Sequence, residues 1–154
     1  AFVASGFAAV RFNFRGVGGT AGVHDAGDGE LDDLLGVVRQ VAPEGPVALA
    51  GFSFGDFVTS HALARLWGER RVERAVLVGT ATSRFTVEPL THDAHMRTLV
   101  VHGEHDETVP LATVMDWARP QTLPVTVVPG GGHFFHGQLP LLKGLVMRHL
   151  QSMP

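Results

Sequence analysis

Continuous apolar runs alternate with segments of helical period along the whole chain, and this alternation constrains the fold more than any other feature. The runs show no regular exchange of polar and apolar residues, which is typical of strands buried on both faces. We expect such strands over residues 7–14, 46–51, 74–79, 98–102 and 125–128. We expect helices over residues 30–41, 54–67, 111–118 and 139–151. The pattern predicts an α/β fold, a doubly wound and mainly parallel sheet with helices on both faces.

Composition places these elements in one domain. The chain has 154 residues, of which 45% are hydrophobic and 18% are charged, so a core is available and disorder is excluded. We expect a single domain over residues 1–154. The formal net charge of −3 gives no indication of a nucleic-acid partner, and nothing indicates a homo-oligomer. Because the chain has no cysteine, disulfides and cysteine nucleophiles are excluded.

No apolar run is long enough to span a bilayer, and no signal peptide is visible. We therefore expect a cytoplasmic protein without a membrane partner. Residues 1–5 are typical of the last turn of an amphipathic helix, with Gly6 as its C-cap. We expect a chain that begins in this way to have lost the elements before that turn. Residues 81–96 are the least regular segment and are too short for a separate lid domain.

The pentapeptide Gly51-Phe-Ser-Phe-Gly55 is the sharpest local feature. It fits the pattern G-x-S-x-G and lies between an expected buried strand and an expected helix. The tight turn that projects Ser53 above the sheet strains its backbone, and glycines at 51 and 55 remove side chains that would collide. This context favours Ser53 as a nucleophile and the Phe54 N–H as an oxyanion donor. The alternative is that Ser53 only caps the helix.

A serine nucleophile needs a base, and the base needs an acid that orients it. In chains with this turn the acid and then the histidine follow the serine. Three acids compete after the strand at 98–102: Glu104, Asp106 and Glu107. They fall at the carboxyl end of a strand, where active loops of open α/β sheets lie.

Two histidines follow a run of three glycines after the strand at 125–128. They are His133 and His136, and this loop also lies at the carboxyl end of a strand. The glycines allow His133 to approach Ser53. His133 is also closer to the strand than His136, so it is the better candidate for the base.

Two alternative interpretations of these loops are weaker. The nine histidines invite a metal site that would include His102, His105, Asp106, His133 and His136. These residues lie on loops and lack the helical histidine spacing of a zinc hydrolase, so we expect no metal. Residues 16–21 fit G-x-G-x-x-A, but the next residues do not begin the helix that a dinucleotide-binding turn needs.

Taken together, the chain resembles the α/β-hydrolase family over essentially its whole length. The resemblance is carried by residues 11–18, 51–55, 101–110 and 132–137, and it is closest to small, cap-less bacterial hydrolases of the dienelactone-hydrolase and carboxylesterase type. It implies Ser53 as nucleophile, His133 as base and Asp106 as acid, because the family's acid precedes a short turn into Val-Pro. The N-terminal strands of the family are missing, and with them the loop that supplies a second oxyanion donor.

The function that we expect is hydrolysis of a carboxylic ester or thioester through an acyl-enzyme, without a cofactor. The partner would be a small-molecule substrate, with a small or unbranched acyl group because no cap is present. Phenylalanines near the candidate residues suggest an apolar mouth or part of the core: Phe52, Phe54, Phe134 and Phe135. The alternative is a non-catalytic module of the same fold that binds a partner.

Overall fold

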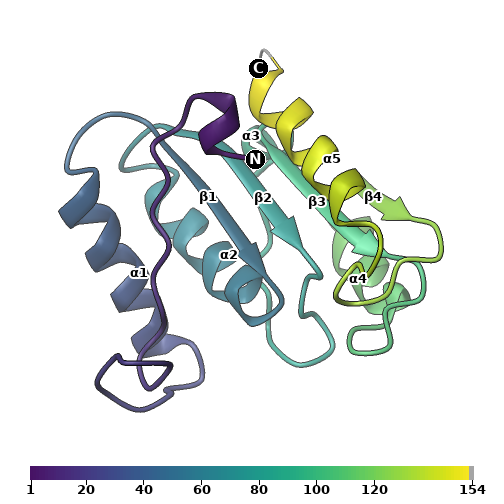
Figure 1. Cartoon of the computed structure of the whole chain (residues 1–154), viewed down its shortest axis with the longest axis horizontal. Coiled ribbons are helices and arrows are strands. Elements are labelled where there is room, and N and C mark those ends of the chain that lie inside the picture. Colours follow the sequence, from purple (N-terminus) through teal and green to yellow (C-terminus); the bar gives the residue numbers. More distant parts are fainter. Residues whose placement is uncertain (153–154) are drawn as a thin grey trace.

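A four-stranded parallel sheet forms the centre of the molecule in the computed structural model, which describes residues 1–152 (Figure 1). The strands are β1 (Val47–Phe52), β2 (Val72–Val78), β3 (Thr98–Gly103) and β4 (Val125–Val128). They pair in the order β1-β2-β3-β4, all parallel, so their carboxyl ends lie at one edge of the sheet. The loops that follow β1, β3 and β4 therefore converge there.

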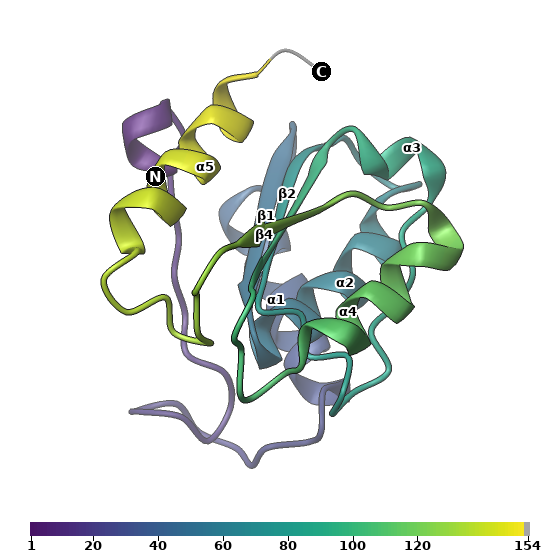
Figure 2. The same cartoon turned by 90° about the vertical axis from the view of Figure 1, so that its right-hand side faces the viewer.

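Helices cover both faces of the sheet, as Figure 2 shows from the side. One face carries α1 (Asp28–Val41), α2 (Phe54–Leu66), the short α3 (His92–His95) and α4 (Leu111–Ala118), which continues into the 3₁₀ turn Arg119–Gln121. The other face carries α5 (Leu139–Gln151) and the N-terminal 3₁₀ turn Val3–Ser5. This arrangement confirms the expected doubly wound α/β fold. None of the helices within residues 1–152 is long and apolar enough to cross a membrane.

Strand β2 explains why the strands lack alternating polarity. Its residues Ala75 and Leu77 join the core beneath α1, α2 and α4, while Val76 and Val78 join the core beneath α5. All four are buried because both faces are covered. In α2, Val58, Ala62 and Leu66 recur at helical spacing and form the side that packs on the sheet.

The expected strand over residues 7–14 is wrong. The segment is extended but belongs to no strand, and β1 is the edge of the described sheet on that side. Figure 1 shows it running past β1 between the N-terminal turn and the start of α1. Val10 and Phe12 are exposed in it, at 56% and 38%. An apolar run becomes a strand only where a neighbouring backbone offers hydrogen-bond partners, and here no neighbour does.

The remaining boundaries agree closely with the expectations. The structure has α4, β4 and α5 at the predicted residues, and α1 begins at Asp28 rather than residue 30. Gly6 has a φ of 87° and forms the C-cap of the N-terminal turn, as expected. The only regular element that residues 81–96 contain is the four-residue α3.

Candidate active site

The turn after β1 holds Ser53 in a conformation that non-glycine residues rarely adopt. Its φ is 54° and its ψ is −116°. A Cβ at Gly51 would overlap the Gly55 carbonyl and the backbone of Asp56, so the close passage of β1 and α2 requires glycine at 51. Gly55 differs from the expectation, because a Cβ there would meet only Phe14, at 3.9 Å. Contacts within the described residues thus explain why position 51 needs glycine, but they give no such reason at position 55.

The side chain of Ser53 faces a histidine instead of capping α2. It forms no helix-capping hydrogen bond, and its Oγ lies 3.0 Å from Nε2 of His133. The other ring nitrogen of His133, Nδ1, lies 2.7 Å from Oδ2 of Asp106. The turn after β1 and the loops after β3 and β4 thus bring together three residues that are far apart in the sequence. This geometry lets Asp106 orient the imidazole and lets Nε2 accept the serine proton.

Among the three acids that competed, only Asp106 reaches the histidine. Its Oδ1 accepts the backbone N–H groups of Thr108 at 2.9 Å and Val109 at 2.7 Å, which leaves Oδ2 for His133. Glu104 and Glu107 are exposed, and Glu104 instead accepts the N–H of Gly130 at 2.8 Å. The turn toward Val109 therefore locks one carboxylate in place.

The imidazole of His133 is closely packed, and two phenylalanine rings contact it. The rings of Phe52 and Phe134 have centroids 4.9 and 5.0 Å from that of the imidazole. Gly79, after β2, has a φ of 62°, and a Cβ there would come within 3.3 Å of His133. The sequence analysis did not include Gly79 in the site. A glycine at the carboxyl end of a strand could have indicated that another group packs closely there. His136 is exposed and stacks on Phe134 instead.

The four phenylalanines of the expected mouth separate into two groups. Phe52 and Phe134 are exposed, at 41% and 58%, and flank His133. Phe135 is only 1% exposed and packs in the core beneath α5, so it does not line a mouth. Phe54 is partly buried against the core. As the first residue of α2, Phe54 has an N–H with no acceptor in its own helix, next to the positive end of the helix dipole.

A second carboxyl group lies beneath the turn and was missed at the sequence level. Asp56 is fully buried in the first turn of α2, and neither of its oxygens has a hydrogen-bond partner within residues 1–152. Burial raises the pKa of Asp56 well above its ordinary value, which the nearby Thr80 hydroxyl opposes only in part. The sequence pattern that could have indicated this is an acidic residue in the first turn of a helix, on a side that faces the core.

The glycine-rich loop after residue 15 does not form a dinucleotide-binding turn. Helix α1 begins only at Asp28, and the G-x-G-x-x-A motif ends at residue 21. The loop is instead tied to α1 by Arg15, whose guanidinium donates to both carboxylate oxygens of Asp33, at 2.9 and 2.7 Å. Within residues 1–152, no group of three or more histidine and acidic side chains is arranged to hold a metal ion.

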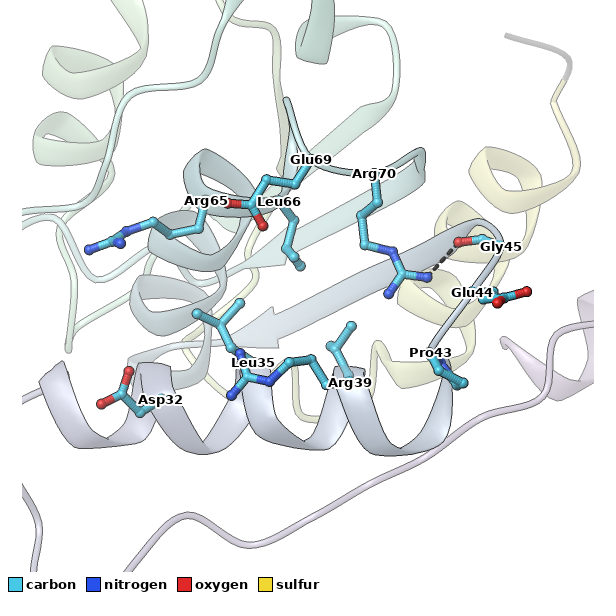
Figure 3. Close-up of a pocket in the computed structure, with 11 residues that line it drawn as sticks. Asp32, Leu35, Arg39, Pro43, Glu44, Gly45, Arg65, Leu66, Glu69 and Arg70 are labelled. Carbon is cyan, nitrogen blue, oxygen red and sulfur yellow. Dashed lines mark hydrogen bonds between the residues drawn. The ribbon is translucent and has the colours of Figure 1, made fainter.

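One cleft in the described part of the chain is lined by none of the candidate site residues. It measures about 490 Å³ and opens between α1, α2 and the residues before β1 (Figure 3). Its lining includes Pro43 and Gly45 before β1 and Leu66 at the end of α2, whereas Ser53 follows β1 and precedes α2. Arg70 closes one side by donating to the Gly45 carbonyl. The cleft thus lies at the opposite end of these elements from the candidate triad.

Comparisons with solved structures identify the family. A lid-less α/β serine hydrolase from Xanthomonas campestris is 35% identical, with a TM-score of 0.77; the match covers 94% of this chain and 67% of that one. An α/β serine hydrolase homologue from Coxiella burnetii is 33% identical, with a TM-score of 0.69, over 91% and 67% of the two chains. The protein Est1E from Butyrivibrio proteoclasticus, at 19% identity and a TM-score of 0.61, covers 78% of this chain and 67% of its own, and shares the fold.

Comparison with protein-family models gives no match, and comparison with curated protein sequences gives none either. The family assignment therefore comes from the solved structures, two of which share about a third of their residues with this chain over most of its length. At this identity and coverage the chain belongs to the α/β-hydrolase family, and its likeness to the lid-less Xanthomonas structure makes it a small hydrolase of the cap-less type.

Proposed function

We propose that this hydrolase cleaves a carboxylic ester or thioester by acyl transfer to Ser53. The observation that carries the proposal is the unbroken chain of contacts from Ser53 Oγ to His133 Nε2, at 3.0 Å, and from His133 Nδ1 to Asp106 Oδ2, at 2.7 Å. A serine hydroxyl is a weak nucleophile at neutral pH, and this arrangement supplies the base that it lacks.

In the first step Ser53 Oγ attacks the substrate carbonyl while His133 Nε2 takes its proton. Asp106 holds the imidazole in the tautomer that carries hydrogen on Nδ1 and stabilises the imidazolium that forms. The Phe54 N–H donates to the oxyanion of the tetrahedral intermediate. His133 then returns the proton to the departing alcohol or thiol, and the acyl group remains on Ser53.

The second step reverses these roles with water. His133 accepts a proton from a water molecule, which attacks the acyl-enzyme, and Ser53 leaves with the proton that His133 returns. The exposed Phe52 and Phe134 beside His133 support an apolar group on the substrate next to the scissile carbonyl. The cap-less architecture favours small or unbranched acyl groups, since no lid encloses a longer chain.

A fluorophosphonate probe tests this proposal directly, because it labels only an activated serine. We expect one label per chain, located on Ser53 by peptide mass spectrometry, and no label in Ser53→Ala. Ser83 provides a matched control, because it is exposed and has no such histidine; Ser83→Ala should label like wild type. An unlabelled wild-type protein would instead favour a non-catalytic binding module of the same fold, and a label that persists in Ser53→Ala would assign the nucleophile to another serine.

A further inference from the structure

His102 is the second-last residue of β3 and is fully buried. It lies beside Asp106, the acid of the proposed triad. Its Nε2 lies 2.9 Å from the carbonyl oxygen of Val109 and 3.4 Å from Oδ2 of Asp106. Both of these atoms are acceptors, so Nε2 carries the hydrogen and donates. The hydrogen bond goes to the Val109 carbonyl, and the carboxylate oxygen lies beside the same nitrogen without accepting from it.

The second ring nitrogen of His102 does not stabilise the fold. Nδ1 of His102 is buried and has no hydrogen-bond partner within residues 1–152, which costs stability. Burial lowers the pKa of His102, more than the Val109 carbonyl and Asp106 raise it, so the ring is neutral at neutral pH. An apolar side chain of similar volume would fill the same space without an unpaired nitrogen. The contacts of Nε2 are therefore what the imidazole contributes at this position.

We propose that His102 is a positioning residue for Asp106. The inference rests on the proposed triad. The carboxylate of Asp106 is held by two backbone N–H groups on Oδ1 and by His133 on Oδ2. The Nε2–H of His102 donates to the Val109 carbonyl, at the end of the turn that supplies those N–H groups, and the same nitrogen lies 3.4 Å from Oδ2. One imidazole thus fixes the backbone that holds the carboxylate and places a partial positive charge beside it.

Three substitutions at this position separate the donor from the volume. In His102→Gln the side-chain amide nitrogen reaches the depth of Nε2, in His102→Asn it stops short, and His102→Leu fills the space without a donor. We expect kcat of the glutamine variant within about threefold of wild type and losses of about 10- to 100-fold for the other two, with KM nearly unchanged. A loss carried by KM, or equal losses in Gln and Asn, would overturn the proposal.

His149 offers a matched control. It also donates Nε2 to a backbone carbonyl, that of Arg97 at 3.1 Å, and burial lowers its pKa as well, but it lies in α5 and does not touch the triad. We expect His149→Leu to lower the melting temperature without changing kcat. If His102→Leu behaved in the same way, His102 would be a packing residue only.

A pH profile distinguishes positioning from general loosening of the fold. The charged and titratable groups that face His102 are Asp106 and His133. Without the Nε2–H of His102 beside Oδ2, the negative charge of Asp106 is stabilised less by its surroundings, and the carboxylate interacts more strongly with the imidazolium of His133. We expect the acid limb of kcat/KM to move to higher pH in His102→Leu and His102→Asn, and to return in His102→Gln. An acid limb that stays in place in the first two variants would argue against the proposal.

Two further outcomes remain decidable. If the asparagine and leucine variants do not fold, His102→Gln decides alone: kcat within about threefold of wild type supports the donor role, and a larger loss overturns it. If the wild type shows no hydrolysis, the low-field proton resonance of the His133–Asp106 hydrogen bond replaces kcat. A shift of that resonance in a folded His102 variant supports positioning although the proposed function has failed, and an unchanged resonance overturns the positioning role separately from the function.

Discussion

Two histidine–carboxylate pairs flank the turn after β1, and their bonds are almost the same length. His133 Nδ1 lies 2.7 Å from Asp106, and His24 Nδ1 lies 2.8 Å from Glu30. Both carboxylates are fully buried, yet the His133 side chain is 6% exposed and that of His24 is 59% exposed. The second nitrogen of His133 faces Ser53, whereas the ring of His24 packs edge-on against Phe54.

The difference teaches that the bond to the carboxylate does not by itself make a catalytic pair. In both places a buried acid fixes an imidazole. Only His133 meets a serine hydroxyl, the proposed nucleophile, with its other nitrogen, and its ring is shielded from water, where hydrogen bonds act more strongly. Glu30 instead accepts the N–H groups of Asp25 and Gly27 at 2.9 Å each and closes the start of α1. One pair is arranged for chemistry and the other for holding a loop.

The largest expected effect separates the two histidines. We expect His133→Ala to lower kcat for a short-chain p-nitrophenyl ester by about a millionfold, because Ser53 loses its base. His24→Ala should stay within about twofold of wild type, since the His24 side chain is exposed and forms no hydrogen bond with Ser53, Asp106 or His133. His136→Ala should behave like His24→Ala, because its ring is exposed and does not reach Ser53. A larger loss at His136 or His24 than at His133 would reassign the base.

The second prediction compares the two acids. Asp106→Asn keeps the shape of the carboxylate but favours the wrong tautomer of His133, so we expect kcat to fall by about 10,000-fold. Glu30→Gln should leave kcat nearly unchanged, as should Glu104→Gln and Glu107→Gln. Steady-state kinetics of the four folded variants provide the test. Near-wild-type turnover in Asp106→Asn would remove Asp106 from the triad.

Asp56 sharpens the comparison because it is buried like Asp106 and Glu30, but neither of its oxygens has a hydrogen-bond partner within residues 1–152. Burial raises its folded-state pKa well above 3.8, so the folded protein keeps a proton that the unfolded chain releases. The stability that this proton provides is complete below the unfolded pKa and is lost as the pH rises toward the folded one. We expect Asp56→Asn to gain about 1–3 kcal/mol near neutral pH and to gain much less in acid.

Urea unfolding of wild type and Asp56→Asn at about pH 4, 6 and 8 measures this difference. Thr59→Val is a suitable control, because Thr59 is also buried in α2 but does not titrate. A gain that is the same at every pH would show that ionisation of Asp56 plays no part.

The smallest expected effect concerns Glu30 and has the opposite sign. Burial alone would raise the pKa of Glu30, but the N–H groups of Asp25 and Gly27, together with His24, lower it below 4.5. Its carboxylate therefore stabilises the fold above the unfolded pKa, and this contribution is lost as the pH falls through the folded one. We expect Glu30→Gln to cost about 1 kcal/mol at neutral pH, since glutamine still caps the helix, and almost nothing in acid. Midpoints of urea unfolding for wild type and Glu30→Gln, at neutral pH and in acid, measure this difference in stability.

Several features of the fold could be predicted because they depend on local pattern. Residues 125–128 and 139–151 show the expected strand and helix at the predicted bounds, since the first is mostly apolar and the second is amphipathic. Residues 7–14 carry an equally apolar run and still form no strand. Strand formation depends on a neighbouring backbone, which no local pattern encodes.

Within the candidate site, sequence order singled out Ser53 and favoured His133 over His136, because their places beside strands are readable from the chain. The order of residues in the sequence did not decide which of three acids orients the histidine. Only the family resemblance favoured Asp106 among them. The structure shows the physical basis: two backbone N–H groups of the turn hold Oδ1 of Asp106 and direct Oδ2 toward His133. Turn geometry of this kind is a property of the folded loop.

The sequence by itself determined the alternation of strands and helices, the tight turn at Ser53 and the kinds of side chain that follow the strands. Only the tertiary structure decided which of these side chains meet, that Phe135 belongs to the core, and that His102 lies behind Asp106. The reason is the range of the forces involved. Backbone conformation and hydrophobic period act between near neighbours in the chain, whereas a hydrogen bond between residues 53 and 133 exists only after the sheet has brought their loops together.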